Sequence, residues 1–262
     1  MTEALLRIEN VSVRFGGLVA LDSVTLETAS GSIQAVIGPN GAGKSTLLNV
    51  ITGLYTASGG SILFRGERID GRTPHAITRR GIARTFQNTE LFGEMTALDN
   101  VMIGLDRFHA YGGVTAAWQG SRYRQIETSA REEARELLAL VGLAGDENEA
   151  AATLPFGKQR RLEIARALAT RPGLLLLDEP AAGLRAAEID ALNRILLDLR
   201  AQRQISILVI DHVMPLVMAI SDRITVLNFG RKIAEGTPDA VRRSPDVIAA
   251  YLGDKAAHAV GT

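Results

Sequence analysis

The chain has 262 residues, with 29 basic and 29 acidic side chains and no cysteine. This length is enough for one or two domains with a sizeable core. The balanced charge argues against a general nucleic-acid binder, and the lack of cysteine excludes disulfides and thiolate metal sites. No apolar run approaches the roughly 18 residues that cross a bilayer, and we expect no signal peptide. A membrane role would therefore need a partner that does the spanning.

The first 30 residues predict short strands. Apolar residues at Leu6, Ile8, Val11 and Val13 are interrupted by polar ones, and Gly16-Gly17 separates them from Val24 and Leu26. Residues 61–66 indicate a further strand that runs into a turn. These segments predict a small antiparallel layer. Phe15 lies at the end of the first strand region, where its ring would either stack on a nucleobase or join the core.

A phosphate-binding loop follows a predicted buried strand at residues 33–37. Residues 38–46 fit the pattern G-x-x-x-x-G-K-[ST] of the P-loop. Its glycines let successive N–H groups turn toward phosphate oxygens, Lys44 reaches the β- and γ-phosphates, and the Ser45 hydroxyl is placed for Mg²⁺. An apolar-faced helix after the loop would point its N-terminus at the nucleotide. The predicted nucleotide-binding residues here are Gly38, Pro39, Asn40, Gly41, Ala42, Gly43, Lys44, Ser45 and Thr46.

The middle of the chain has a helical character from about residue 90 to 170. Glu127 to Leu140 has an amphipathic pattern, whereas residues 107–124 are either a loop or broken helices. Gln87 precedes this region. Its amide is a candidate contact for both Mg²⁺ and the attacking water, and the alternative is a plain hydrogen-bonded loop glutamine. Residues 154–160 precede an apolar-faced helix, which is either a second phosphate-receiving N-terminus or a simple helix start.

Acidic and imidazole groups follow two predicted buried strands. Asp178-Glu179 ends a run of four leucines, at the strand end where α/β sheets bind ligands. We expect Asp178 to hold Mg²⁺ and Glu179 to polarise the attacking water; the alternative is an ordinary strand end. His212 follows the strand at 206–211 and is a candidate γ-phosphate contact, although a lone histidine is often structural. Alternating strands and helices, with a helix at 186–200, predict an α/β fold whose sheet is mostly parallel.

Taken in order, these segments resemble the ATP-binding subunit of an ABC transporter. The resemblance rests on the P-loop, Gln87, residues 154–160, Asp178-Glu179 and His212, and covers residues 5 to 253. It implies a P-loop NTPase core with an antiparallel β layer (1–90 and 168–253), a helical subdomain (91–167) and a flexible tail (254–262). It also implies that ATP, with Mg²⁺, lies between the P-loop of one copy and the signature loop of another. The signature residues are Phe156, Gly157 and Lys158.

Further segments narrow the resemblance to the branched-chain amino acid importers, and to the longer of their two ATPases. They are residues 15–21, 161–168, 180–184, 220–224 and 244–253. Three positions depart from the family pattern. Pro155 replaces a serine and has neither a hydroxyl nor a backbone N–H. Lys158 either adds positive charge near the phosphate or points to solvent. Arg185 replaces an asparagine that is frequent in the subgroup.

The resemblance implies partners and a location. The implied partners are a second ATPase copy or paralogue and membrane-spanning permease subunits docked near Gln87, with a substrate-binding protein as an indirect partner. The implied location is the cytoplasmic face of the inner membrane. Other cargoes remain open: urea, short amides, other amino acids, or lipid export. A soluble ABC ATPase without a permease is a further alternative, disfavoured by the balanced charge. A P-loop kinase or GTPase would leave residues 154–160 unexplained.

Overall fold

A computed structural model describes residues 4–87, 89–106 and 121–251. The chain divides into two compact units, Met1–Arg84 with Gly173–Thr262 and Thr85–Pro172. Within the described residues, no helix combines the length and the apolar character that a membrane crossing requires.

The first unit is built on a six-stranded sheet of order β10-β9-β3-β8-β7-β6, in which only β10 is antiparallel to its neighbour. Its three central strands β3, β7 and β8 are buried at every residue, as expected when both faces of a parallel sheet are covered. This confirms the mostly parallel sheet. The strands are β3 (Ile33–Ile37), β6 (Ile82–Arg84), β7 (Leu174–Asp178), β8 (Ser206–Ile210), β9 (Arg223–Asn228) and β10 (Arg231–Gly236).

A four-stranded antiparallel sheet of order β2-β1-β4-β5 forms the predicted β layer. It contains β1 (Ala4–Phe15), β2 (Leu18–Ala29), β4 (Gly59–Phe64) and β5 (Glu67–Arg68). β1 and β2 are each 12 residues long, rather than the short strands expected. Their pairing shifts register between Ile8 and Val11 and again after Val13, so these bulges break the alternation that a long strand would show.

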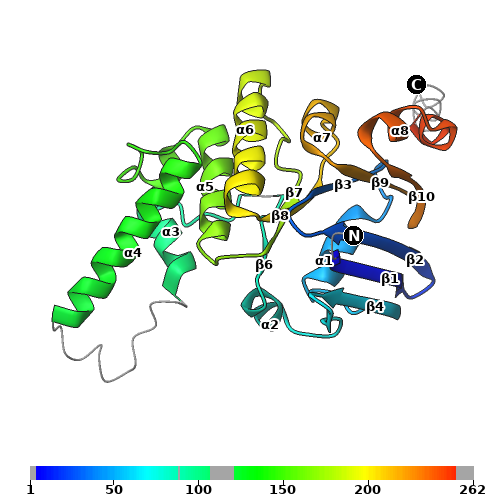
Figure 1. The fold of residues 1–262 in the computed structure, drawn as a ribbon, viewed down its shortest axis with the longest axis horizontal. Helices are drawn as coiled ribbons and strands as arrows, with labels where there is room; N and C mark the ends of the chain where they lie inside the picture. The colour runs from blue at the N-terminus through cyan, green and yellow to red at the C-terminus, as the bar shows by residue number, and fades with distance from the viewer. Residues whose placement is uncertain (1–3, 88, 107–120, 252–262) are drawn as a thin grey trace. The chain divides into compact units, whose positions relative to one another are not determined.

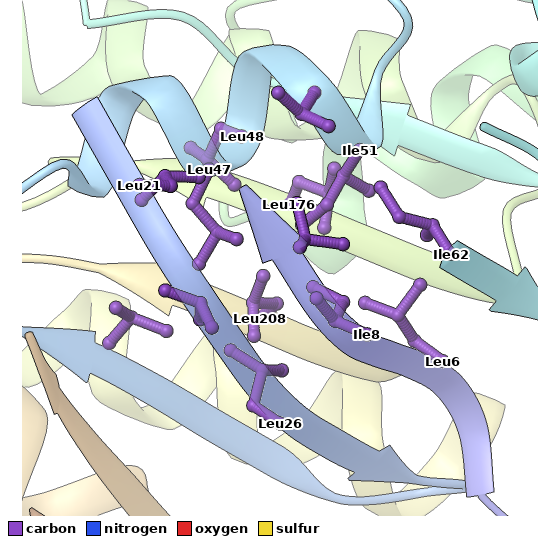
Figure 2. Packing of buried hydrophobic residues seen from close by; sticks show 14 of the residues in the cluster. Leu6, Ile8, Leu21, Leu26, Leu47, Leu48, Ile51, Ile62, Leu176 and Leu208 are labelled. Carbon is purple, nitrogen blue, oxygen red and sulfur yellow. The ribbon is translucent and has the colours of Figure 1, made fainter. Parts of the chain in front are cut away.

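Helix α1 (Lys44–Ile51) lies between the two sheets and completes the core (Figure 1). Figure 2 shows Leu47, Leu48 and Ile51 of α1 packed among leucines and isoleucines of β1 and β2 and against Leu176 and Leu208 of the large sheet. All of these side chains are at most 1% exposed. Burial of this size, about 1.5–3 kcal/mol for each large apolar side chain, fixes the P-loop helix against the sheet.

The opposite face of the six-stranded sheet carries α6 (Ala186–Arg203) and α7 (Met214–Ile220), as Figure 1 shows. The predicted helix at 186–200 is therefore correct and continues to Arg203. The remaining helices of this unit are α2 (Pro74–Arg79), α8 (Pro238–Arg242) and residues 245–251. Residues 254–262, the expected flexible tail, lie outside the described residues.

The second unit is helical. It contains α3 (Ala97–Leu105), α4 (Ser121–Leu140), α5 (Phe156–Leu168) and the short 3-10 helix η2 (Ala151–Thr153). A Cβ on Gly104 would lie 2.6 Å from the Arg166 carbonyl oxygen, so α3 and α5 approach closely there. Of the unassigned segment 107–124, residues 107–120 lie outside the described residues and 121–124 form the first turn of α4.

Candidate functional site

The predicted P-loop connects the end of β3 to the start of α1, and two of its glycines, Gly38 and Gly43, lie too close to neighbouring backbone to carry a side chain. Gly38 has φ +154°, and a Cβ there would overlap the Leu227 carbonyl oxygen of β9. Gly43 has φ +98°, and a Cβ there would lie 2.6 Å from the Ala20 carbonyl oxygen. Gly43 is also the N-cap of α1 and supplies no side-chain cap, so the first N–H groups of the helix have no side-chain acceptor there.

Lys44 lies inside the loop that it belongs to. Its Nζ donates to the carbonyl oxygens of Gly38 at 2.7 Å and Pro39 at 2.9 Å, and the residue is only 7% exposed. Burial lowers the pKa of the Lys44 ammonium, and the charges of Glu179 and Asp178 oppose this effect. Asn40, Gly41 and Ser45 are exposed, whereas Thr46 is half-buried. A buried cation surrounded by open loop positions suits a polyphosphate.

Asp178 ends β7 as a buried, ion-paired carboxylate and not as an exposed strand-end acid. Its Oδ2 accepts from Arg84 Nη2 at 2.8 Å, and the two side chains are 6% and 8% exposed. The same guanidinium donates through Nη1 to Asn49 Oδ1 at 2.7 Å and Thr52 Oγ1 at 3.2 Å. One arginine therefore joins β6, β7 and α1.

Glu179 and His212 are brought together by two adjacent strand ends. Glu179 Oε2 lies 3.6 Å from His212 Nδ1, and the Glu179 N–H donates to the Ile210 carbonyl at 2.7 Å. Glu179 has φ +49°, a left-handed conformation that is uncommon for a residue with a side chain. Such strain persists where surrounding contacts impose it, and it is frequent at functional sites.

Asp211 supplies part of that constraint. Its buried carboxylate accepts from the N–H groups of Ala181 and Val213, both at 2.9 Å, so it joins the loop after β7 to the loop after β8. Burial raises the pKa of the Asp211 carboxyl, and the two amides oppose that rise. Asp211 therefore braces the loops that carry Glu179 and His212.

Phe15 neither joins the core nor lies isolated. Its side chain is 45% exposed and meets Tyr55 edge to face, with 5.1 Å between the ring centroids. One exposed ring held in place by another is suited to stacking on a planar ligand.

The remaining candidates belong to the second unit. Phe156 and Gly157 begin α5; Phe156 is 45% exposed and Gly157 is buried. Lys158 forms an ion pair with Asp146, in which its Nζ donates to Oδ1 at 2.7 Å and to Oδ2 at 2.9 Å. Gln87 is an exposed residue whose backbone carbonyl accepts from Arg160.

Arg160 connects these residues within the second unit. Besides the Gln87 carbonyl, its guanidinium binds the Phe86 carbonyl at 3.1 Å and Glu163 at 3.1 Å, and it stacks 5.0 Å from the Phe156 ring centroid. Burial raises the pKa of the Glu163 carboxyl, against the attraction of Arg160 and the Glu90 amide. Arg160 thus fixes Phe156 relative to the segment that carries Gln87.

Sequence reasoning missed Arg84, Asp211 and Arg160 as parts of the site. Arg84 is 94 residues from Asp178, and Asp211 is 30 from Ala181. Neither pair has a local spacing signal. Arg160 lies within the segment 154–160, but the sequence indicates nothing of its contacts.

Comparison with known proteins places the chain in a family. The sequence model of the ABC transporter family matches residues 21–182, and that of the branched-chain amino acid ATP-binding cassette transporter matches residues 231–257. The high-affinity branched-chain amino acid transport ATP-binding proteins BraF of Pseudomonas aeruginosa and LivG of Escherichia coli are 44% and 42% identical. Each match covers 97% of this chain and all of the relative.

A solved structure agrees with these matches. The crystal structure of an ATP-binding cassette of an ABC transporter in its ADP conformation has a TM-score of 0.83 and 33% identity. The match covers 96% of this chain and 100% of the chain in that structure. Two family matches and full-length relatives above 40% identity leave no other assignment: the chain belongs to the ATP-binding proteins of ABC transporters.

Proposed function

We propose that this protein is the ATP-hydrolysing subunit of an importer of branched-chain amino acids, working at the cytoplasmic face of the membrane beneath separate permease subunits. The observation that carries the proposal is the convergence of the P-loop, Asp178 and the Glu179–His212 pair at the carboxyl ends of neighbouring parallel strands. That edge of an α/β sheet is where ligands bind.

The proposed roles follow from the contacts. Backbone N–H groups of residues 40–46 surround the phosphates, and Lys44, already buried in the loop, exchanges its carbonyl partners for β- and γ-oxygens. Phe15, supported by Tyr55, stacks on the adenine. Glu179 orients and polarises the attacking water, and His212, held beside it, contacts the γ-phosphate.

Mg²⁺ fits the oxygen donors present here. Ser45, Asp178 and Gln87 are the proposed ligands, directly or through water, and hydroxyl, carboxylate and amide oxygens suit this hard cation. When bound, Mg²⁺ neutralises charge on the β- and γ-phosphates.

Hydrolysis is proposed to require a second ATPase, either another copy or a paralogue. Phe156 and Gly157 at the start of α5 would then receive the γ-phosphate of the opposite copy. Because Asp146 holds the Lys158 ammonium, the backbone amides of α5 and not this side chain are the main candidates for that contact. The same backbone amides would take the place of the serine hydroxyl that Pro155 lacks.

Cargo is inferred from relatives and not from this chain's own site. BraF and LivG are named as branched-chain amino acid transport proteins, and the family matched at residues 231–257 is named for the same cargo. Transport also implies an extracytoplasmic substrate-binding protein that delivers the cargo to the permease. Co-reconstitution with neighbouring permeases should drive ATP-dependent uptake of labelled leucine. Uptake of urea or short amides and not of leucine would overturn the cargo assignment. Absence of any permease partner would favour the alternative of a soluble ABC ATPase.

The catalytic assignment is tested by Glu179→Gln. Removing the carboxylate's charge while keeping its shape should leave ATP binding within about threefold and lower turnover by at least about 100-fold. Asp190→Asn, on the exposed face of α6, is the matched control and should hydrolyse ATP at the parent rate. Turnover by Glu179→Gln at the parent rate would overturn the assignment.

A further inference from the structure

We propose that Arg84 is a positioning residue for the Mg²⁺ of the nucleotide site: one guanidinium sets the separation of the proposed metal ligands Ser45 and Asp178. The inference rests on the proposed function, because it concerns the metal that accompanies ATP. It is carried by three hydrogen bonds that reach two other elements of the first unit.

Arg84 binds one of the two carboxylate oxygens of Asp178. Arg84 lies at the end of β6, paired with Leu176 of the neighbouring β7, so its side chain runs alongside the last residues of that strand. Nη2 binds Oδ2 of Asp178 at 2.8 Å. With Oδ2 held by the guanidinium, Oδ1 is the oxygen that would serve Mg²⁺, directly or through water.

Arg84 also binds the helix that carries Ser45. Asn49 and Thr52 follow Ser45 by four and seven residues, and residues at this spacing share one face of an α-helix. Nη1 of Arg84 binds both of them, at 2.7 Å and 3.2 Å. The guanidinium therefore holds the Ser45 face of α1 and the Asp178 end of β7 at once.

The ion pair between Arg84 and Asp178 is buried. Arg84 and Asp178 side chains are 8% and 6% exposed, so water does not substitute readily for the missing partner when one is removed. The planar guanidinium presents these donors in a fixed fork, whereas the lysine ammonium is a compact charge on a flexible stem and holds such a geometry less well. Partners behind a metal ligand commonly change metal affinity by about 10- to 100-fold.

The test measures ATP affinity with excess Mg²⁺ and with EDTA. We define the ratio as the dissociation constant in EDTA divided by the dissociation constant in excess Mg²⁺. By linkage, this ratio changes between variants by the same factor as metal affinity for the bound nucleotide. Arg84→Gln should lower that ratio by about 10- to 100-fold and change the EDTA value by less than about threefold. Arg84→Lys should recover part of the loss. Arg200→Gln, which removes a partly exposed ion pair with Asp222 elsewhere in this unit, should leave both values at the parent level.

Each outcome decides between the proposals. An unchanged ratio in folded Arg84→Gln overturns the positioning role. Should that variant not fold, Asn49→Ala removes one arm and keeps the Asp178 pair; a several-fold lower ratio supports the role, and an unchanged ratio overturns it. A parent protein that binds ATP equally with and without Mg²⁺ also overturns the inference. Failure of the parent to bind ATP in either buffer contradicts the proposed function instead.

Discussion

Asp211→Asn should loosen the brace between the loops that carry Glu179 and His212 without altering the sequence of either loop. The carboxylate accepts one N–H from each loop, at Ala181 and Val213. An asparagine keeps one acceptor oxygen and turns an NH₂ group toward the second amide. The substitution is nearly isosteric, so its effects report on hydrogen bonding and charge and not on packing.

The magnitude follows from two opposing effects at neutral pH. Losing one hydrogen bond to a buried charged group costs about 1.5–3 kcal/mol. Removing the buried charge relieves part of that cost, because burial is the larger influence on the Asp211 pKa. We expect a net loss of about 1–2 kcal/mol in the free energy of unfolding, or about 2–8 °C in Tm for a chain of this size.

The pH dependence has a definite sign. Because the folded-state pKa of Asp211 is raised above its ordinary 3.8, the folded protein binds this proton more tightly than the unfolded chain. Its contribution to stability is therefore fully present below 3.8 and is lost as pH rises through the raised pKa. The stability gap between parent and Asp211→Asn should widen as pH falls from 7 toward 4, by at most about 1.4 kcal/mol per pH unit.

Urea denaturation of both proteins at a series of pH values measures the gap directly. Asp190→Asn, an exposed substitution on α6, should stay within about 0.5 kcal/mol of the parent throughout. A gap that narrows on acidification would show that the two amides outweigh burial, and the reasoning would be refuted. ATP turnover should fall in Asp211→Asn, since Glu179 and His212 lose their common brace.

Two further predictions concern the P-loop and the ion pair between Lys158 of α5 and Asp146. Gly43→Ala should destabilise the protein by about 3 kcal/mol or more, because its Cβ would meet the Ala20 carbonyl. Gly41→Ala, at φ +76° in open space, should cost only the backbone strain of about 1–2 kcal/mol, as thermal denaturation would reveal. Alanine variants of Lys158 and Asp146, singly and together, should give a coupling energy of about 0.5–1 kcal/mol; a coupling near zero would mean that solvent screens the pair completely.

Contiguous signals made much of the fold predictable. The P-loop, the buried run before Asp178 and the strand before His212 each depend on neighbours in sequence, and the structure has strands and a helix at those places. The lengths of β1 and β2 were underestimated for a physical reason. Bulges near Asn10 and Ser23, both at positive φ, interrupt the period of two on which strand prediction depends.

Partnerships across the chain were not predictable in the same way. Nothing near Arg84 indicates that it will find Asp178 and Asn49, because only the parallel pairing of β6 with β7 and the packing of α1 bring them together. The Lys158–Asp146 pair was missed similarly, since the loop between α4 and α5 sets its approach. Local pattern identified the chemical groups, and tertiary packing determined how they are held.

Light scattering on Glu179→Gln with saturating MgATP tests the central claim most directly. The account holds that two ATPase copies enclose the nucleotide between the P-loop of one and the Phe156–Gly157 start of α5 in the other. It predicts the mass of one chain without nucleotide and of two chains with it, and a return to one chain in the Gly157→Arg variant that blocks the second surface. A mass that stays at one chain with MgATP demonstrably bound would contradict the account.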